Sequence, residues 1–143
     1  MRFTAALGFV AVLGLLNVAV ARAGDAEDLA AMKGIWSIVA AERDGKDVTD
    51  ATVTMTFDGV SKVAVKRGDK QIFDGTAKLD AAKSPKTIDV TQETEGDLKG
   101  RTIPGIYELS GDTLKVCSGK ERPTDFTAAA GSNRFLRVYK RAK

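Results

Sequence analysis

The sequence predicts an all-β protein: a single antiparallel up-and-down β-barrel of about eight strands, preceded by a short helix. From residue 34 onward, apolar and polar residues alternate with a period of two, which is typical of half-buried strands. Turn-forming residues recur at intervals of about 8 to 15, as they do in all-β barrels and sandwiches. Eight strands close into a barrel whose interior is filled by side chains or holds one small ligand.

Residues 1–23 have the pattern of an export signal that is removed. Arg2 supplies the positive charge, residues 5–20 are apolar apart from Asn17, and Ala21-Arg22-Ala23 is a small-x-small cleavage pattern. A retained membrane anchor is disfavoured, because about 16 apolar residues fall short of the roughly 20 that cross a bilayer. We therefore expect residues 24–143 to form one mature domain without a membrane span, in the periplasm or outside the cell.

One helix and eight strands are expected in the mature domain. Asp25 can cap a helix over residues 25–33, and Gly34 can end it. The expected strands cover residues 35–42, 52–57, 60–66, 71–79, 86–92, 103–109, 112–117 and 134–140.

The alternation also predicts which side chains point into the barrel. These residues are almost all apolar, so the lumen either holds a small apolar ligand or is filled by the protein's own side chains. In a domain this short we expect a small or absent lumen. The expected inner rows are Val53, Met55 and Phe57; Val63 and Val65; Phe73, Gly75, Ala77 and Leu79; Ile88 and Val90; Gly105, Tyr107 and Leu109; and Leu114 and Val116.

Lys33-Gly34-Ile35-Trp36, at the start of the first expected strand, resembles the Gly-x-Trp signature of lipocalins. Further blocks resemble those of a lipocalin-like secreted domain of planctomycete-type bacteria, a family without an established function. The resemblance covers residues 32–140 and implies the barrel fold. The resembling blocks are residues 41–46, 78–80, 85–90, 105–117 and 121–126.

The resemblance also implies a structural plug at one end of the barrel. In lipocalins the tryptophan of the signature closes the barrel and a cationic side chain packs over its ring, which assigns Gly34 and Trp36 to the plug. Arg137 and Arg141 are the candidate cations. We prefer Arg141, because it lies beyond the last expected strand.

Composition argues against several classes of protein. The chain has no histidine, the commonest base of hydrolases and a usual zinc ligand. Loss of Arg2 and Arg22 with the signal leaves 20 basic and 19 acidic residues, which is not the basic footprint of a nucleic-acid binder. Cys117 stands alone, so no internal disulfide can form, and we interpret it as a small strand residue. We predict no catalytic residue, metal or cofactor, and a monomer.

Three polar groups of residues leave alternatives open. Residues 93–97 contain three acids, Glu93, Glu95 and Asp97, which we expect to be solvated rather than to bind a metal or catalyse. Arg122 can offer a bidentate donor to a carboxylate or phosphate at the barrel mouth. We favour a structural role for Arg122, because the following proline holds it extended in a loop. The C-terminal basic residues, expected on an outer strand face and tail, are Arg134, Arg137, Lys140, Arg141 and Lys143.

The sequence therefore favours an exported, non-enzymatic binding module for a small apolar ligand or for another protein. The apolar inner rows predict a ligand of fatty-acyl or terpenoid type rather than a sugar or nucleotide. The alternative is an envelope enzyme that uses carboxylates and Arg122 at the open end of the barrel. The candidate ligand-binding residues are Met55, Phe73, Tyr107 and Arg122.

Overall fold

The computed structural model describes residues 23–143, so the predicted export signal lies outside the described residues except for Ala23. This part of the chain has one helix, α1 (Ala23–Met32), and nine strands. The strands are β1 (Gly34–Arg43), β2 (Lys46–Asp47), β3 (Val53–Phe57), β4 (Lys62–Arg67), β5 (Lys70–Asp80), β6 (Thr87–Gln92), β7 (Thr102–Ser110), β8 (Thr113–Gly119) and β9 (Arg134–Arg141).

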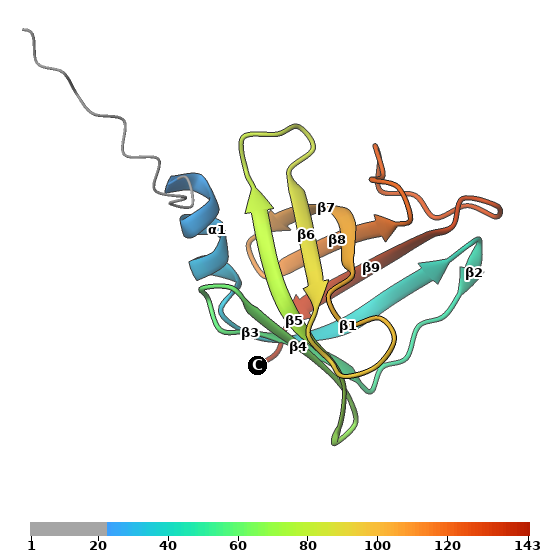
Figure 1. Ribbon diagram of the computed structural model, residues 1–143, viewed down its shortest axis with the longest axis horizontal. Helices are drawn as coiled ribbons and strands as arrows, with labels where there is room; N and C mark the ends of the chain where they lie inside the picture. Colours follow the sequence, from blue (N-terminus) through green and yellow to red (C-terminus); the bar gives the residue numbers. More distant parts are fainter. Residues whose placement is uncertain (1–22) are drawn as a thin grey trace, which may run out of the picture.

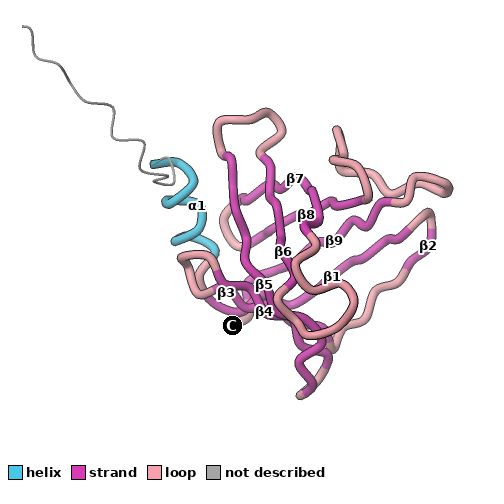
Figure 2. The backbone as a smooth tube through the Cα atoms, viewed as in Figure 1, coloured by secondary structure: helices cyan, strands magenta, loops and turns pink. Residues whose placement is uncertain are grey.

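Eight of the strands form a closed antiparallel barrel (Figures 1 and 2). β1 and β3 to β9 pair in chain order, and β9 returns to pair with β1. That closing register runs from Trp36 opposite Arg141 to Arg43 opposite Phe135. β3 pairs with the first part of β1, and the two-residue β2 pairs with its last two residues. The predicted up-and-down barrel with a short helix is confirmed.

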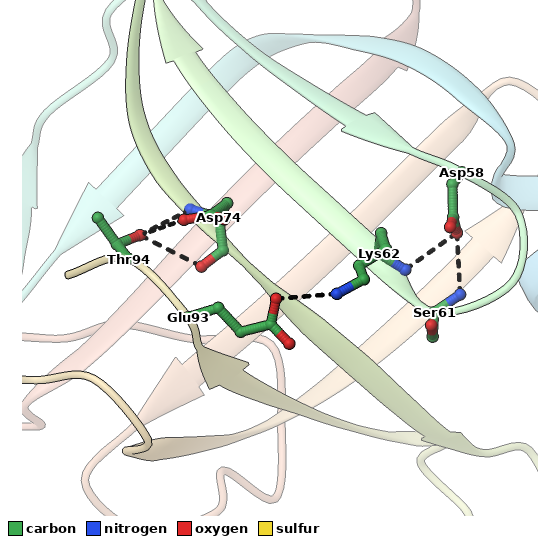
Figure 3. Close-up of polar contacts among 6 residues, drawn as sticks. All are labelled: Asp58, Ser61, Lys62, Asp74, Glu93 and Thr94. Atoms are coloured by element: carbon green, nitrogen blue, oxygen red, sulfur yellow. Dashed lines mark hydrogen bonds and ion pairs between the residues drawn. The ribbon is translucent and has the colours of Figure 1, made fainter.

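Local hydrogen bonds move two of the expected boundaries. β4 begins at Lys62 rather than at residue 60, because Oδ1 of Asp58 accepts hydrogen bonds from the backbone N–H groups of Val60, Ser61 and Lys62. Figure 3 shows the bonds from Ser61 and Lys62. The helix begins at Ala23, so Asp25 lies inside it rather than capping it. The buried Asp25 carboxylate instead accepts a hydrogen bond from the Ala81 N–H at 2.6 Å, which ties α1 to the loop after β5.

The two ends of the barrel differ. At the closed end, which contains Trp36, α1 packs its buried residues Leu29 and Met32 against the core. Figure 1 shows α1 at the left of the barrel and the β1–β2 turn at the right. The open end lies where β1 and β8 finish and β9 begins, near Arg43 and Phe135.

No helix within residues 23–143 has the length and apolar character that crossing a membrane requires.

Candidate functional site

A cavity of about 300 Å³ lies inside the barrel toward the open end. Its volume is at the lower limit of the roughly 300–1,000 Å³ usual for small-molecule sites. Every strand of the ring contributes to its wall, which is mostly apolar, and two of the predicted ligand-binding residues, Met55 and Phe73, belong to it. The lumen is therefore small but not filled by side chains. Its apolar wall includes Met55, Phe57, Val65, Phe73, Val90 and Val116.

Two of the small inner residues are required by close strand packing rather than by room for a ligand. A Cβ atom at Gly75 would collide with the Thr91 carbonyl oxygen. One at Gly105 would lie 2.9 Å from the Cys117 carbonyl oxygen, closer than real Cβ contacts. A side chain at either position would push neighbouring strands apart, so neither glycine can be used to test the lumen by filling it.

Trp36 forms the floor of the barrel at the closed end. Its side chain is fully buried, and its Nε1–H donates to the Met32 carbonyl oxygen at 2.8 Å. This hydrogen bond links the indole to the last residue of α1. Gly34, two residues earlier, has a φ of 122°, a conformation that L side chains rarely adopt. The glycine is needed here for the path of the backbone from helix to strand.

Arg141, and not Arg137, lies over the Trp36 ring, with its guanidinium carbon 4.3 Å from the ring centroid. Nη2 of Arg141 donates to the Ala31 carbonyl oxygen at 2.6 Å, and Nη1 donates to that of Lys33 at 3.0 Å. These acceptors are at the C-terminal end of α1, where carbonyl groups lack helical partners and a cation is favourable. Arg141 is the last residue of β9 rather than part of a tail beyond it.

Tyr107, which the sequence offered as a ligand-binding residue, lies at the closed end and is not among the residues that line the cavity. The ring is buried, and its hydroxyl donates to Oδ2 of Asp28 in α1 at 2.6 Å. Lys86 Nζ donates to the same carboxylate oxygen at 2.9 Å. Burial, together with the hydrogen bond to Asp28, raises the pKa of the Tyr107 phenol. The hydroxyl therefore stays protonated and holds α1 onto the barrel.

Arg122 does not point into the barrel mouth either. Its Nη2 donates to Oδ1 of Asp89 at 2.7 Å, and its Nη1 donates to the Gly105 carbonyl oxygen at 2.8 Å. Asp89 alternates with the inward residues Ile88 and Val90 of β6, which places the ion pair on the outer surface. The contacts of Arg122 are those of a loop anchor.

Two of the three acidic residues after β6 form ion pairs with different lysines. Nζ of Lys62 in β4 donates to Oε2 of Glu93 at 3.0 Å in one ion pair (Figure 3), and Glu95 pairs with Lys99. Side chains that pair with different lysines do not converge on one ligand. Among residues 23–143, no group of three or more His, Cys, Asp and Glu side chains is placed to hold a metal ion.

Cys117 is a buried strand residue whose thiol lies 3.5 Å from the Thr127 carbonyl oxygen, to which it donates. Burial raises the pKa of the Cys117 thiol. The reactive thiolate is therefore disfavoured at neutral pH.

Arg137 is the residue that sequence reasoning misplaced. It lines the cavity together with Phe135, on the same face of β9 as Tyr139 and Arg141, and not on an outer cationic face. Arg43 lines the cavity as well, so the interior is not wholly apolar. In the structure Arg137 shares its face of β9 with the buried Tyr139, but the sequence of β9 carries apolar and cationic residues on both faces and so gave no clear signal.

No protein-family model matches this sequence, and no curated protein matches it significantly.

Proposed function

We propose that this chain is an exported, non-enzymatic binding module that takes a small, mainly apolar ligand into its barrel. The observation that carries the proposal is the cavity of about 300 Å³ with a mostly apolar wall. Transfer of apolar ligand surface into such a site gains about 25 cal/mol per Å². At roughly 30 Å³ for each water-sized group, the cavity accommodates on the order of ten non-hydrogen atoms.

The alternative of an envelope enzyme receives less support from the polar residues. Catalysis by acid and base groups needs side chains that converge in a cleft. Arg122 instead pairs with Asp89 on the outer surface, and Glu93 pairs with Lys62. Residence in the periplasm or outside the cell remains part of the proposal and rests on the pattern of residues 1–23.

The proposal is tested with 1-decanol, a neutral amphiphile whose ten-carbon chain matches the estimated capacity of the lumen. We expect saturable binding in the micromolar range, followed by amide chemical shifts in the NMR spectrum of the protein, with the largest changes along the cavity wall. Absence of saturable binding would contradict a ligand-binding lumen. It would favour a function on the outer surface of the barrel.

A matched pair of valine variants locates the site. Val90→Phe adds volume inside the cavity and should weaken decanol binding about tenfold or more. Val60→Phe makes the same change at a residue that is 72% exposed, in the turn before β4, and should leave binding unchanged. Equal effects of the two substitutions would place the decanol outside the lumen.

A further inference from the structure

The side chain of Arg137 enters the lumen with a buried donor that has no partner among the described residues. Its Nη2 donates to Oγ of Ser118 at 3.0 Å. Its Nε is buried, and within residues 23–143 it has no hydrogen-bond partner. Buried donors of charged groups are almost always paired, because water no longer solvates them. The unpaired Nε therefore marks a place where an acceptor from outside the chain fits.

Arg43 brings a second positive charge to the same place. The guanidinium carbons of Arg43 and Arg137 lie 4.2 Å and 4.6 Å from the centroid of the Phe135 ring. Neither arginine forms an ion pair with a carboxylate of the described residues. Because arginine stays protonated in proteins, this part of the cavity wall carries two cations without a counter-charge.

The approach to the cavity is cationic too. A larger hollow of about 900 Å³ lies at the open end between the strand ends, and it shares Arg43, Ser118 and Phe135 with the lumen. An entrance lined by one sign of charge attracts ligands of the opposite sign. Its wall has one carboxylate, Asp44, against four cations, Arg43, Arg101, Lys120 and Arg134, of which Arg134 is paired with Asp125.

We propose that the ligand is an anionic amphiphile, with a carboxylate bound to Arg137 and an alkyl chain in the apolar part of the lumen. This inference rests on the proposed function. The carboxylate accepts a hydrogen bond from Nε of Arg137, and Arg43 on the neighbouring strand adds a second positive charge. A neutral ligand leaves Nε unpaired, and a cationic one adds a third positive charge beside Phe135. Charge therefore selects among ligands of equal apolar size.

The first test is a series of three ligands that share a ten-carbon chain and differ in the head group: decanoate, 1-decanol and decyltrimethylammonium. At pH 7 the native protein should bind decanoate about ten to a hundred times more tightly than decanol, since charge-assisted hydrogen bonds are among the strongest. Decyltrimethylammonium should bind more weakly than decanol. Equal affinity for decanoate and decanol would overturn the inference and leave the proposed function intact. Binding of none of the three would overturn both.

The second test compares two variants of β9, one that removes a positive charge from the inner face and one that removes a positive charge from the outer face. Arg137→Gln should reduce the preference for decanoate over decanol about tenfold, and the affinities of the variant for both ligands are measured to obtain that ratio. Lys140→Gln removes an equal charge from an exposed residue of the same strand and should change the preference less than twofold. Retention of the full preference in Arg137→Gln would contradict the assignment.

An NMR measurement on the native protein tests the same contact without a variant, so its result does not depend on whether the variant folds. The Nε–H resonance of Arg137 should move markedly on addition of decanoate and little on addition of decanol. An Arg137 resonance that responds equally to both ligands would show that the carboxylate binds elsewhere.

Discussion

The two ends of the barrel use arginines from the same face of β9 in opposite ways. At the closed end, Arg141 lies over Trp36, and its three nitrogens donate to Asp112 at 3.2 Å and to two carbonyl oxygens at the end of α1. At the open end, Arg137 contacts the Phe135 ring, but its Nε has no partner among the described residues. An arginine on an aromatic ring is thus structural where its donors are satisfied, and available to a ligand where one is not.

The largest expected effect separates the floor of the barrel from its mouth. Trp36→Ala should lower the free energy of unfolding by about 3 to 5 kcal/mol, because it leaves a large cavity at a fully buried position. Phe135→Ala, at the half-buried open end, should cost about 1 kcal/mol, in proportion to the smaller area it buries. Urea denaturation of the two variants measures the difference. Similar losses would mean that both ends are equally part of the core.

A smaller effect tests the arginines directly. Arg141→Gln should cost about 1 to 3 kcal/mol, since it removes a cation–π contact and hydrogen bonds to the carbonyl groups of α1. Arg137→Gln should change stability by no more than about 0.5 kcal/mol, because the lost contacts are offset by removal of a buried, unpaired charged donor. Both variants are measured by urea denaturation. If Arg137→Gln is as destabilising as Arg141→Gln, then Arg137 is also a structural residue and the contrast between the two ends is wrong.

The smallest expected effect is a pH dependence at the closed end. The pKa of Tyr107 is raised in the folded protein above the value of about 10 of an unfolded chain. Above pH 10 the unfolded state therefore binds fewer protons, and the contribution of Tyr107 to the free energy of unfolding falls by up to about 1.4 kcal/mol per pH unit. Below pH 10 this contribution is fully present.

Tyr107→Phe isolates that contribution. The variant should be less stable than the native protein by about 1 kcal/mol near pH 8, where the hydrogen bond to Asp28 is intact. This difference should shrink as the pH rises from 10 to 11.5, and urea denaturation at a series of pH values would follow it. A difference that stays constant over this range would mean that the Tyr107 phenol ionises as easily when folded as when unfolded.

The strands could be predicted from the sequence because most inner rows are apolar and the outer rows are polar. Val53, Met55 and Phe57 of β3 alternate with threonines, and the structure has all three buried as expected. The two-residue β2 was missed because two residues show no period. Its pairing with β1 follows from the turn at Asp44 and Gly45, both with positive φ.

The candidate site was less accessible to sequence reasoning, because β9 has no clear polar face. Its sequence, RFLRVYKR, places apolar and cationic residues on both sides, so alternation alone does not say which arginines enter the barrel. The pairing of β9 with β1 and β8 determines which of its arginines face the lumen. The partners of Tyr107 and Arg122 lie 79 and 33 residues away in the chain and depend on strand register, which local patterns do not contain.

The pairing of β1 with β9 has a consequence for the order of events during synthesis. β1 leaves the ribosome early, yet one of its edges has no partner until β9 has been translated about a hundred residues later. An unpaired strand edge is open to association with other chains, and contacts between distant parts of a chain form slowly. The same late strand delivers Arg141 to the end of α1, which adds to the contacts that the helix makes with Ala81 and Tyr107. Pairing of β9 with β1 therefore closes the ring of strands and removes this open edge.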